Sequence, residues 1–237
     1  MSLICDLFIF SPLCHSIVFV TGNANKLREV KKILCSDISS DASLKIEVES
    51  KALDLPEIQG STQDVAREKS KAAAKLIGGP CITEASLISL IHSVARKVCP
   101  SKLTRRCLPS FRIPHCASKL WVIYQVNSIK GPYIKWFLEK LGLDGLNTML
   151  EGFKNKEATA LCTFAYCEPG KDPILFEGAT QGTIVPPRGP TNFGWDPIFE
   201  VVGTGLTYAE MSSEQKNGLS HRSKALDKLR RHFSNLQ

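Results

Sequence analysis

The residues best suited to chemistry form a short polar loop between an apolar run and a helix-forming segment. Residues 17–26 read IVFVTGNANK, and a helix is predicted over 26–34. A strand that turns tightly into a helix N-terminus leaves backbone N–H groups free to bind an anion such as phosphate. The Thr21 hydroxyl, the Asn23 amide and the Lys26 ammonium add further ligands. The pattern predicts a phosphate site, although it also fits an ordinary strand–turn–helix corner.

Two further polar residues lie in the next part of the chain. Glu57 is in a Pro- and Gly-bounded loop, DLPEIQG (54–60), where its carboxylate could approach Mg²⁺, a cation that prefers oxygen ligands. Lys69 lies on the predicted helix that follows. The alternatives are a solvated loop acid for Glu57 and a surface lysine for Lys69, so neither residue defines a site by itself.

The C-terminal half contains an aromatic loop and a basic segment. FGWD (193–196) combines Phe193 and Trp195 with an acid, which suits the stacking and edge recognition of a flat base, or equally the anchoring of a loop in the core. Lys216, Ser220, His221 and Arg222 lie early in a predicted last helix. Their cations could neutralise phosphate or donate to a purine carbonyl, unless they form an ordinary basic helix face.

The elements that would position these groups indicate an α/β fold with a central mixed β-sheet and flanking helices. A helix from Ser61 to about Ile77 begins with a capping-box pattern, and a second helix has one apolar face formed by Ile134, Phe137, Leu138 and Leu141. The last helix is expected over about 212–233, with Leu219, Leu226 and Leu229 at helical spacing. The strands expected after 17–20 are 44–50, a short one at 80–84, 157–168 and 173–185.

Composition limits the function classes. The chain has 237 residues, 43% of them hydrophobic, and a net charge of +7. The positive charge comes from residues 85–130, which carry eight basic and no acidic residues, so a nucleic-acid-binding function of the whole protein is disfavoured. Nine cysteines without a CxxC pair favour buried free thiols in a reducing compartment, here the cytoplasm.

The apolar N-terminus raises the question of targeting. No Lys or Arg precedes Lys26, and Asp6, Pro12 and His15 interrupt the apolar run, so a secretory signal and a membrane span are both disfavoured. We interpret residues 1–15 as an extension that precedes one domain, residues 16–237.

Six ordered motifs together resemble one family. IVFVTGNANK, DLPEIQG, GPYIKWFLEKLG, FGWDPIF, TYAEM and KNGLSHR closely resemble the inosine triphosphate pyrophosphatase family, over about residues 17–84 and 131–233. The resemblance implies a homodimer whose subunits have two lobes around a nucleotide-binding cleft. It implies hydrolysis of noncanonical purine nucleoside triphosphates (ITP, dITP and XTP) to the monophosphate and pyrophosphate, with Mg²⁺ as cofactor and Mn²⁺ as a possible replacement.

The family's site residues can be carried over position by position. Lys69 and Glu84 would be catalytic, and Glu57 would bind the metal. The residues implied to hold the triphosphate are Thr21, Gly22, Asn23, Ala24, Asn25, Lys26, Lys69 and Lys135. Those implied to bind the base and complete the site are Phe193, Gly194, Trp195, Asp196, Lys216, His221 and Arg222.

The chain departs from the family at one strand. Where the family has Glu-Asp-Thr, this chain has Glu84, Ala85 and Ser86, so the acid expected to bind metal and activate water is absent. The basic tract 86–130 follows at once, and we interpret it as an insertion, derived from a retained intron or a gene-model error. The alternative function is therefore a catalytically impaired nucleotide-binding member of the family. RNA binding through the tract is a third, disfavoured hypothesis.

Overall fold

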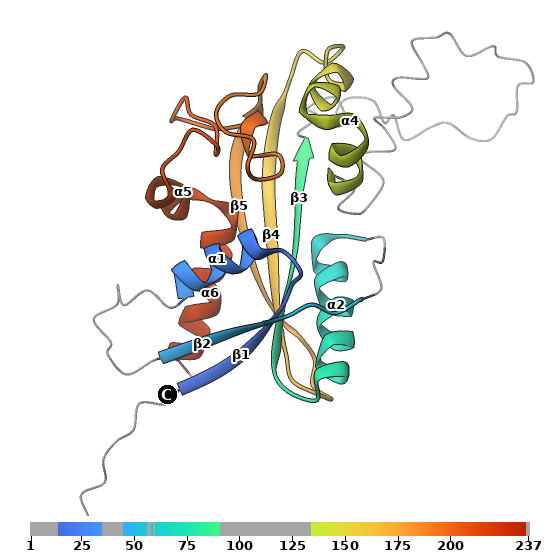
Figure 1. Ribbon diagram of the computed structural model, residues 1–237, viewed down its shortest axis with the longest axis vertical. Coiled ribbons are helices and arrows are strands. Elements are labelled where there is room, and N and C mark those ends of the chain that lie inside the picture. The colour runs from blue at the N-terminus through green and yellow to red at the C-terminus, as the bar shows by residue number, and fades with distance from the viewer. Residues whose placement is uncertain (1–13, 35–44, 56–57, 59, 91–133, 236–237) are drawn as a thin grey trace, which may run out of the picture.

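The computed structural model describes residues 14–34, 45–55, 58, 60–90 and 134–235 (Figure 1). One six-stranded sheet has the order β2-β1-β3-β4-β5-β6. Its strands are β1 (Cys14–Val20), β2 (Lys45–Lys51), β3 (Cys81–Leu90), β4 (Glu157–Cys167), β5 (Ile174–Ile184) and β6 (Phe199–Val201). The helices are α1 (Ala24–Leu34), α2 (Thr62–Ile77), α4 (Ile134–Met149), α5 (Ser213–Leu219) and α6 (His221–Ser234), with a 3₁₀ turn, η2 (Asp196–Ile198).

The sheet is mixed, as the sequence predicts. β1 pairs in parallel with both β2 and β3, whereas β3, β4, β5 and β6 pair antiparallel in succession. The parallel pairs follow from the helical crossovers α1 and α2, because parallel neighbours need a long connection. β4 and β5, with eleven residues each, are the longest of the described strands. They are joined by a short turn, so they run antiparallel as predicted.

Helices cover both faces of the sheet (Figure 1). α1 and α6 pack against each other over one face, where Phe19, Phe164, Phe176 and Leu226 are buried in the main core. α2 covers the other face, against β3 and β4. A second core, around Phe199, lies beneath α4, η2 and β6. The two faces of β3 therefore look into different surroundings, which matters for the site.

Local signals set the bounds of α2. Ser61 caps the helix by accepting a hydrogen bond from the Asp64 backbone N–H, and the Asp64 carboxylate accepts one from the Ser61 backbone N–H. Gly78 ends the helix in the left-handed conformation, with φ of 72°. The predicted helix is thus confirmed, and so is its capping box.

Several predicted bounds need correction. β3 has ten residues rather than five, and residues 86–90 pair with β4, so the first residues of the predicted insertion are part of the sheet. The expected single last helix is two helices, because Ser220 has an extended backbone between α5 and α6. Leu141 and Leu219 are 44% and 38% exposed, so neither is a core position of its helix. Each is followed by a residue with a non-helical backbone, Gly142 or Ser220, which the apolar spacing does not reveal.

Other predictions concern residues outside the described ones or only partly within them. Residues 1–13 and 91–133 lie outside, which includes most of the predicted extension and of the predicted insertion. Among the cysteines, Cys81, Cys162 and Cys167 are buried free thiols, as expected. Of the described helices, none has the length and apolar character needed to cross a membrane.

Candidate active site

The TGNANK loop caps α1 with its own side chains. Asn23 Oδ1 accepts hydrogen bonds from the backbone N–H groups of Asn25 and Lys26, at 3.0 and 3.2 Å. The Asn23 N–H donates in turn to Thr21 Oγ1, at 3.1 Å. The φ of Gly22 is not positive, and an added Cβ there would meet only Ala52 Cβ, at 3.9 Å. The backbone conformation at position 22 therefore does not require a glycine. What the loop contributes is an exposed helix N-terminus with Lys26 beside it.

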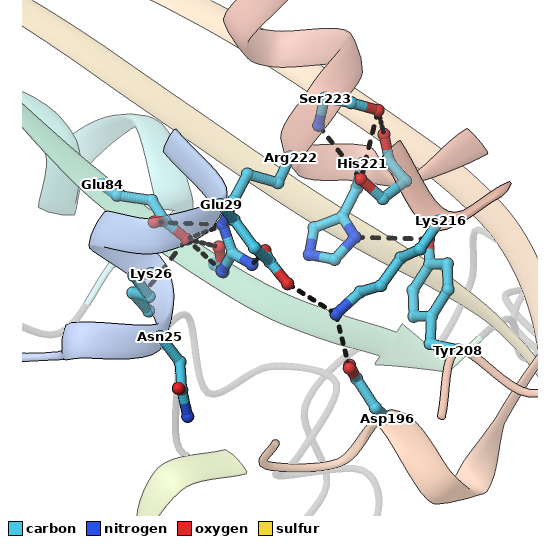
Figure 2. A network of polar contacts seen from close by, with 12 residues as sticks. Asn25, Lys26, Glu29, Glu84, Asp196, Tyr208, Lys216, His221, Arg222 and Ser223 are labelled. Atoms are coloured by element: carbon cyan, nitrogen blue, oxygen red, sulfur yellow. Dashed lines mark hydrogen bonds and ion pairs between the residues drawn. The ribbon is translucent and has the colours of Figure 1, made fainter. Parts of the chain in front are cut away.

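A chain of alternating charges runs from this loop across the sheet (Figure 2). Three basic and three acidic side chains come from five elements, and each contacts an opposite charge. In order along the chain they are Lys26, Glu84, Arg222, Glu29, Lys216 and Asp196. Buried charges need such pairing, because an unpaired ion loses its hydration without compensation.

Arg222 is the centre of this ion-pair chain. Its guanidinium contacts Glu84 Oε1 at 2.8 Å and also pairs with Glu29. Lys26 Nζ lies 3.3 Å from the same Glu84 oxygen. The side chains of Arg222 and Glu84 are only 4% and 2% exposed. Glu84 is therefore fixed between two cations and is not a free base.

Lys216 extends the chain toward the aromatic loop. Its ammonium lies 2.8 Å from Glu29 Oε1 and 2.5 Å from Asp196 Oδ2. It also lies 4.5 Å from the centre of the Phe193 ring, and the Arg222 guanidinium is 5.4 Å from that centre. Both cations thus lie within cation–π distance of one aromatic ring, whose quadrupole attracts positive charge.

The environments of the three acids shift their pKa values differently. Burial raises the pKa of Glu84, but Arg222 and Lys26 outweigh it, so the pKa lies well below its usual range. The pKa of Glu29 is also lowered, because Arg222 and Lys216 together exceed the effect of burial. The pKa of Asp196 is raised, since burial exceeds the effect of its one close partner, Lys216. Two cations are needed to keep a buried acid strongly ionised here.

His221 lies beside the ion-pair chain and is 2% exposed. Its pKa lies well below the usual value, because burial and the neighbouring Arg222 both disfavour a second positive charge, so the ring is neutral. Nδ1 lies 3.4 Å from the Tyr208 hydroxyl, while Nε2 has no hydrogen-bond partner within the described part of the chain. When Tyr208 donates to Nδ1, the single ring proton resides on Nε2. A buried N–H donor is then left for a ligand.

Aromatic rings frame His221. The ring centres of Trp195 and His221 are 5.4 Å apart, and those of Tyr208 and His221 are 5.8 Å apart. Trp195 also packs edge-on against Phe199, at 5.5 Å, which joins the loop to the core. Phe193 and Trp195 are both partly exposed. The two interpretations of FGWD therefore coexist: Trp195 anchors the loop, while open ring surface remains near His221.

Short-range features of the sequence bring α6 to this place. Ser220 caps α6, and its side chain accepts a hydrogen bond from the Ser223 backbone N–H at 3.1 Å, so His221 and Arg222 occupy the first turn. Gly178 on β5 lets that turn approach the sheet. A Cβ on Gly178 would lie 2.0 Å from the His221 carbonyl oxygen, which no side chain could tolerate.

The opposite face of β3 has a different character. Ala85 is 4% exposed and packs in an apolar cluster with Val65, Ala66 and Ala165. Neighbouring strand residues point to opposite faces, so Glu84 and Ala85 do not share an environment. Ala85 therefore offers no polar group to the face beneath α2, and Glu84 does not replace the missing acid there.

The structure brings together one part of the predicted site and leaves another part open. Residues from distant parts of the chain meet in the ion-pair chain and around it: Lys26, Glu84, Phe193, Trp195, Asp196, Lys216, His221 and Arg222. Lys69 lies on α2, which covers the other face. Glu57 lies outside the described residues, and the Lys135 side chain does as well, although its backbone is part of α4.

Sequence reasoning missed Glu29, Tyr208 and Gly178. A signal exists for Glu29, because it lies three residues after Lys26 and so shares a helix face with it. Tyr208 is in the quoted motif TYAEM, but nothing local indicates its contact with His221. Gly178 is one glycine among sixteen, and only the tertiary contact distinguishes it.

The described residues do not by themselves form a metal site. Among them there is no group of three or more His, Cys, Asp or Glu side chains that could hold a metal ion. Glu29, Glu84 and Asp196 each face a cation. The predicted ligand Glu57 lies outside this set, so the described site does not fit a Mg²⁺ ion held by protein groups alone.

Comparison with solved structures gives the fold class. A HAM1 protein from Coxiella burnetii aligns with 93% of this chain and 99% of its own length, with a TM-score of 0.66 and 24% identity. The Ham1 protein of Staphylococcus aureus aligns with 94% of this chain and all of its own length, with a TM-score of 0.62 and 22% identity. At these identities the likeness concerns the fold.

Comparison of sequences gives the family. The sequence profile of the Ham1 family matches residues 17–91 and 121–232. The inosine triphosphate pyrophosphatase of Puccinia graminis f. sp. tritici is 68% identical over 218 residues, which cover 92% of this chain and 96% of that protein. The enzyme of the same name from Mycosarcoma maydis is 49% identical over 212 residues, 89% of this chain and 91% of that protein. The chain belongs to the Ham1 family.

Proposed function

We propose that this protein hydrolyses the noncanonical purine nucleoside triphosphates ITP, dITP and XTP to the monophosphate and pyrophosphate, and so removes them from the nucleotide pool. Its Ham1 membership supports this, as do relatives named inosine triphosphate pyrophosphatase that align over nearly their whole length. The observation in this chain that carries the proposal is the buried, neutral His221, whose Nε2 has no partner in the described part of the protein.

The polarity around His221 explains a preference for 6-oxo purines. His221 Nε2–H, Lys216 and Arg222 are all donors, and a 6-oxo group is an acceptor. The 6-amino group of adenine is itself a hydrogen-bond donor, so it could not accept from these protein donors. The buried donors would be left unpaired, which costs about 1–3 kcal/mol for each group. The open surfaces of Phe193 and Trp195 would stack on the ring.

The triphosphate would extend from the surroundings of His221 to the N-terminus of α1. The capped helix end and Lys26 favour negative charge there. Mg²⁺ belongs to the proposal as a partner of the substrate, because triphosphate oxygens supply most of the ligands such an ion needs. When bound, the ion would offset charge on the phosphate oxygens. Glu57 is the protein ligand that the sequence suggests.

The central test is a pyrophosphate-release assay on this chain with ITP, XTP and ATP in the presence of Mg²⁺. The proposal predicts release from ITP and XTP well above release from ATP, and loss of release when EDTA removes the metal. Equal rates for all three nucleotides would contradict it. Mn²⁺ can be tested in the same assay.

One observation favours a second candidate, a nucleotide-binding protein with impaired turnover. Ala85 lies in an apolar cluster where the family's sequence pattern calls for an acid, so the described residues lack the group expected to activate water. This candidate predicts ITP binding by calorimetry without pyrophosphate release. Tight binding together with release at the rate of an Ala85→Asp variant would rule it out.

Assembly and location form the last part of the proposal. We infer a homodimer in the cytoplasm from the resemblance described above and from the free thiols Cys81, Cys162 and Cys167. Analytical ultracentrifugation of the full chain tests the dimer, and a single species at the monomer mass across micromolar concentrations would refute it.

A further inference from the structure

Two cysteines face each other at the end of the β3–β4 ladder. Cys81, the first residue of β3, is directly opposite Cys167, the last residue of β4. Directly opposed residues in an antiparallel pair have Cα atoms about 4.5–5.5 Å apart. Disulfides join Cα atoms roughly 4.4–6.8 Å apart. The register therefore places the two residues at a spacing that a disulfide can bridge, at a terminal rung where the backbone can adjust.

Both cysteines pack against the same part of α2. The Cys81 thiol donates to the Ser70 carbonyl oxygen at 3.7 Å, whereas the Cys167 thiol donates to the carbonyl oxygens of Glu168 and Lys171, at 3.4 and 3.5 Å. The two cysteines share a buried cluster with Ala73 and Ala74. The shared cluster and the strand register thus place both cysteines next to each other beneath α2, as a direct bond between them requires.

Cys167 is only 2% exposed, but it lies at the edge of the surface. It lines a surface pocket of about 480 Å³ between α2 and the β4–β5 turn, with Lys71, Lys75 and Lys171 among the other lining residues. Cys81 does not line this pocket and is fully buried. Of the two buried cysteines, Cys167 is therefore the one that an oxidant in the pocket would reach first. Cys162, by contrast, lies opposite Ser86 and Gly178 and has no thiol across the ladder.

We propose that Cys81 and Cys167 form an oxidisable dithiol, which a small hydroperoxide converts to a cross-strand disulfide. The Cys167 thiolate attacks the peroxide oxygen, forming an S–O bond and breaking the O–O bond, with water or an alcohol as the leaving product. Cys81 sulfur then attacks Cys167 sulfur, the S–O bond breaks, and water leaves. Two thiols lose two electrons and two protons in total, and the hydroperoxide accepts both.

Burial makes this dithiol slow to react and sensitive to pH. Burial raises the pKa of Cys81 to about 12 and raises that of Cys167, although Lys71 favours the Cys167 thiolate. The thiolate is the reactive form, so the rate should rise about tenfold for each pH unit while the pH stays below both pKa values. Brief oxidant exposure at neutral pH should leave the pair reduced, and prolonged exposure should join it.

The experiment uses the full chain, oxidised with hydrogen peroxide at pH 7.0, 8.0 and 9.0. Free thiols are then blocked with N-ethylmaleimide, and disulfide-linked peptides are identified by mass spectrometry without reduction. We expect a linked peptide that joins Cys81 to Cys167, formed faster at higher pH and lost on treatment with dithiothreitol. The melting temperature should rise by several degrees on oxidation, because the bond closes a long loop of the unfolded chain.

Variants separate this bond from general oxidation. Cys81→Ser should abolish the linked peptide and the thermal shift, and it should leave Cys167 free to over-oxidise to sulfinic acid. The matched control Cys162→Ser should retain both signals. Cys167 found unmodified, or linked mainly to cysteines other than Cys81 while the protein remains folded by circular dichroism, would overturn the proposal. Because the mapping is done on the wild-type chain, the test stands even when a variant fails to fold.

Discussion

Glu84 and Ala85 are adjacent in β3, yet they face two chemically different sides of the sheet. The Glu84 side holds alternating charges, a neutral histidine and open aromatic surface. The Ala85 side, beneath α2, is apolar at that rung. In the proposed function, recognition of a base would use the first kind of surface, whereas activation of water near a phosphate would need an acid on the second. The two tasks would then depend on neighbouring residues on separate faces, so one could be lost while the other survived.

Restoring an acid to the apolar side should have the largest effect. We expect Ala85→Asp to raise kcat for ITP by about 10²–10⁴-fold, the usual contribution of a general base. The same change should lower the free energy of unfolding by at least about 1–3 kcal/mol, because it buries a carboxylate among apolar groups. Pyrophosphate release and urea denaturation measure the two effects.

Ala85→Asn is the matched control for this variant, because it has the same size without a basic oxygen. It should share the loss of stability and show no gain in rate. Equal rates for the Asp and Asn variants would mean that the apolar side does not limit turnover.

Breaking the charged side should mainly cost stability. Arg222→Met leaves Glu84 and Glu29 without their shared partner, so we expect a loss of about 3–5 kcal/mol in the free energy of unfolding. Arg230→Met is the control, because Arg230 pairs with Asp227 at the surface and such pairs contribute about 0–1 kcal/mol. Chemical denaturation measures both. Similar losses in the two variants would show that the buried ion-pair chain contributes no more than a surface pair.

The pH dependence of stability should report on His221. The folded pKa of His221 is lowered, so below pH 6.5 the unfolded chain binds a proton that the folded chain does not. Its stabilising contribution is complete above about pH 6.5 and falls by up to about 1.4 kcal/mol per pH unit as the pH drops. His221→Phe should reduce this slope between pH 6.5 and 5.5.

The control for this slope is Leu229→Ala, which removes buried apolar surface and no titrating group. It should lower the free energy of unfolding by a similar amount at both pH values. An unchanged slope in His221→Phe would assign the pH dependence to other groups.

The smallest effect is expected at the base of the aromatic loop. Arg188 holds that loop to the neighbouring segment through Glu200 at 2.5 Å and the Gly205 carbonyl at 3.3 Å. Its side chain is 40% exposed, so Arg188→Met should cost less than about 1 kcal/mol in stability. The Kd for ITP should rise a few-fold as Phe193 loses its fixed position. Calorimetry measures this, and an unchanged Kd would separate the loop from base binding.

Sequence alone predicted most of the fold, because the signals are local. The capping box at Ser61 and the turn between β4 and β5 each specify an element without reference to the rest of the chain. The break at Ser220 was missed, since Ser fits a helix surface as well as a cap. The length of β3 was also missed, because the predicted insertion begins at residue 86, although residues 86–90 (SLISL) carry no basic residue and continue the strand.

The site was predictable only as a set of residue types. Motif order grouped Lys26, Lys216 and Arg222, but it did not indicate that these cations pair with acids of the protein and are not left unpaired for phosphate. Those pairs span most of the chain, and spacing along a sequence carries no information on such contacts. Which side of the sheet each member of the Glu84–Ala85 pair faces follows from strand geometry, once the helices on each face are known.

The ion-pair chain also has a consequence for the order of folding. Glu29 lies in the first described helix and Arg222 in the last, 193 residues apart, so their ion pair closes a very long loop and should form late. During synthesis the ion-pair chain would stay incomplete until α6 emerged from the ribosome. A nascent chain that lacked α6 could fold β1 to β3 with α2, yet its Glu84 would lack Arg222 and keep only Lys26 as a partner. Retention on an ITP-agarose resin would therefore distinguish complete chains from such truncated ones.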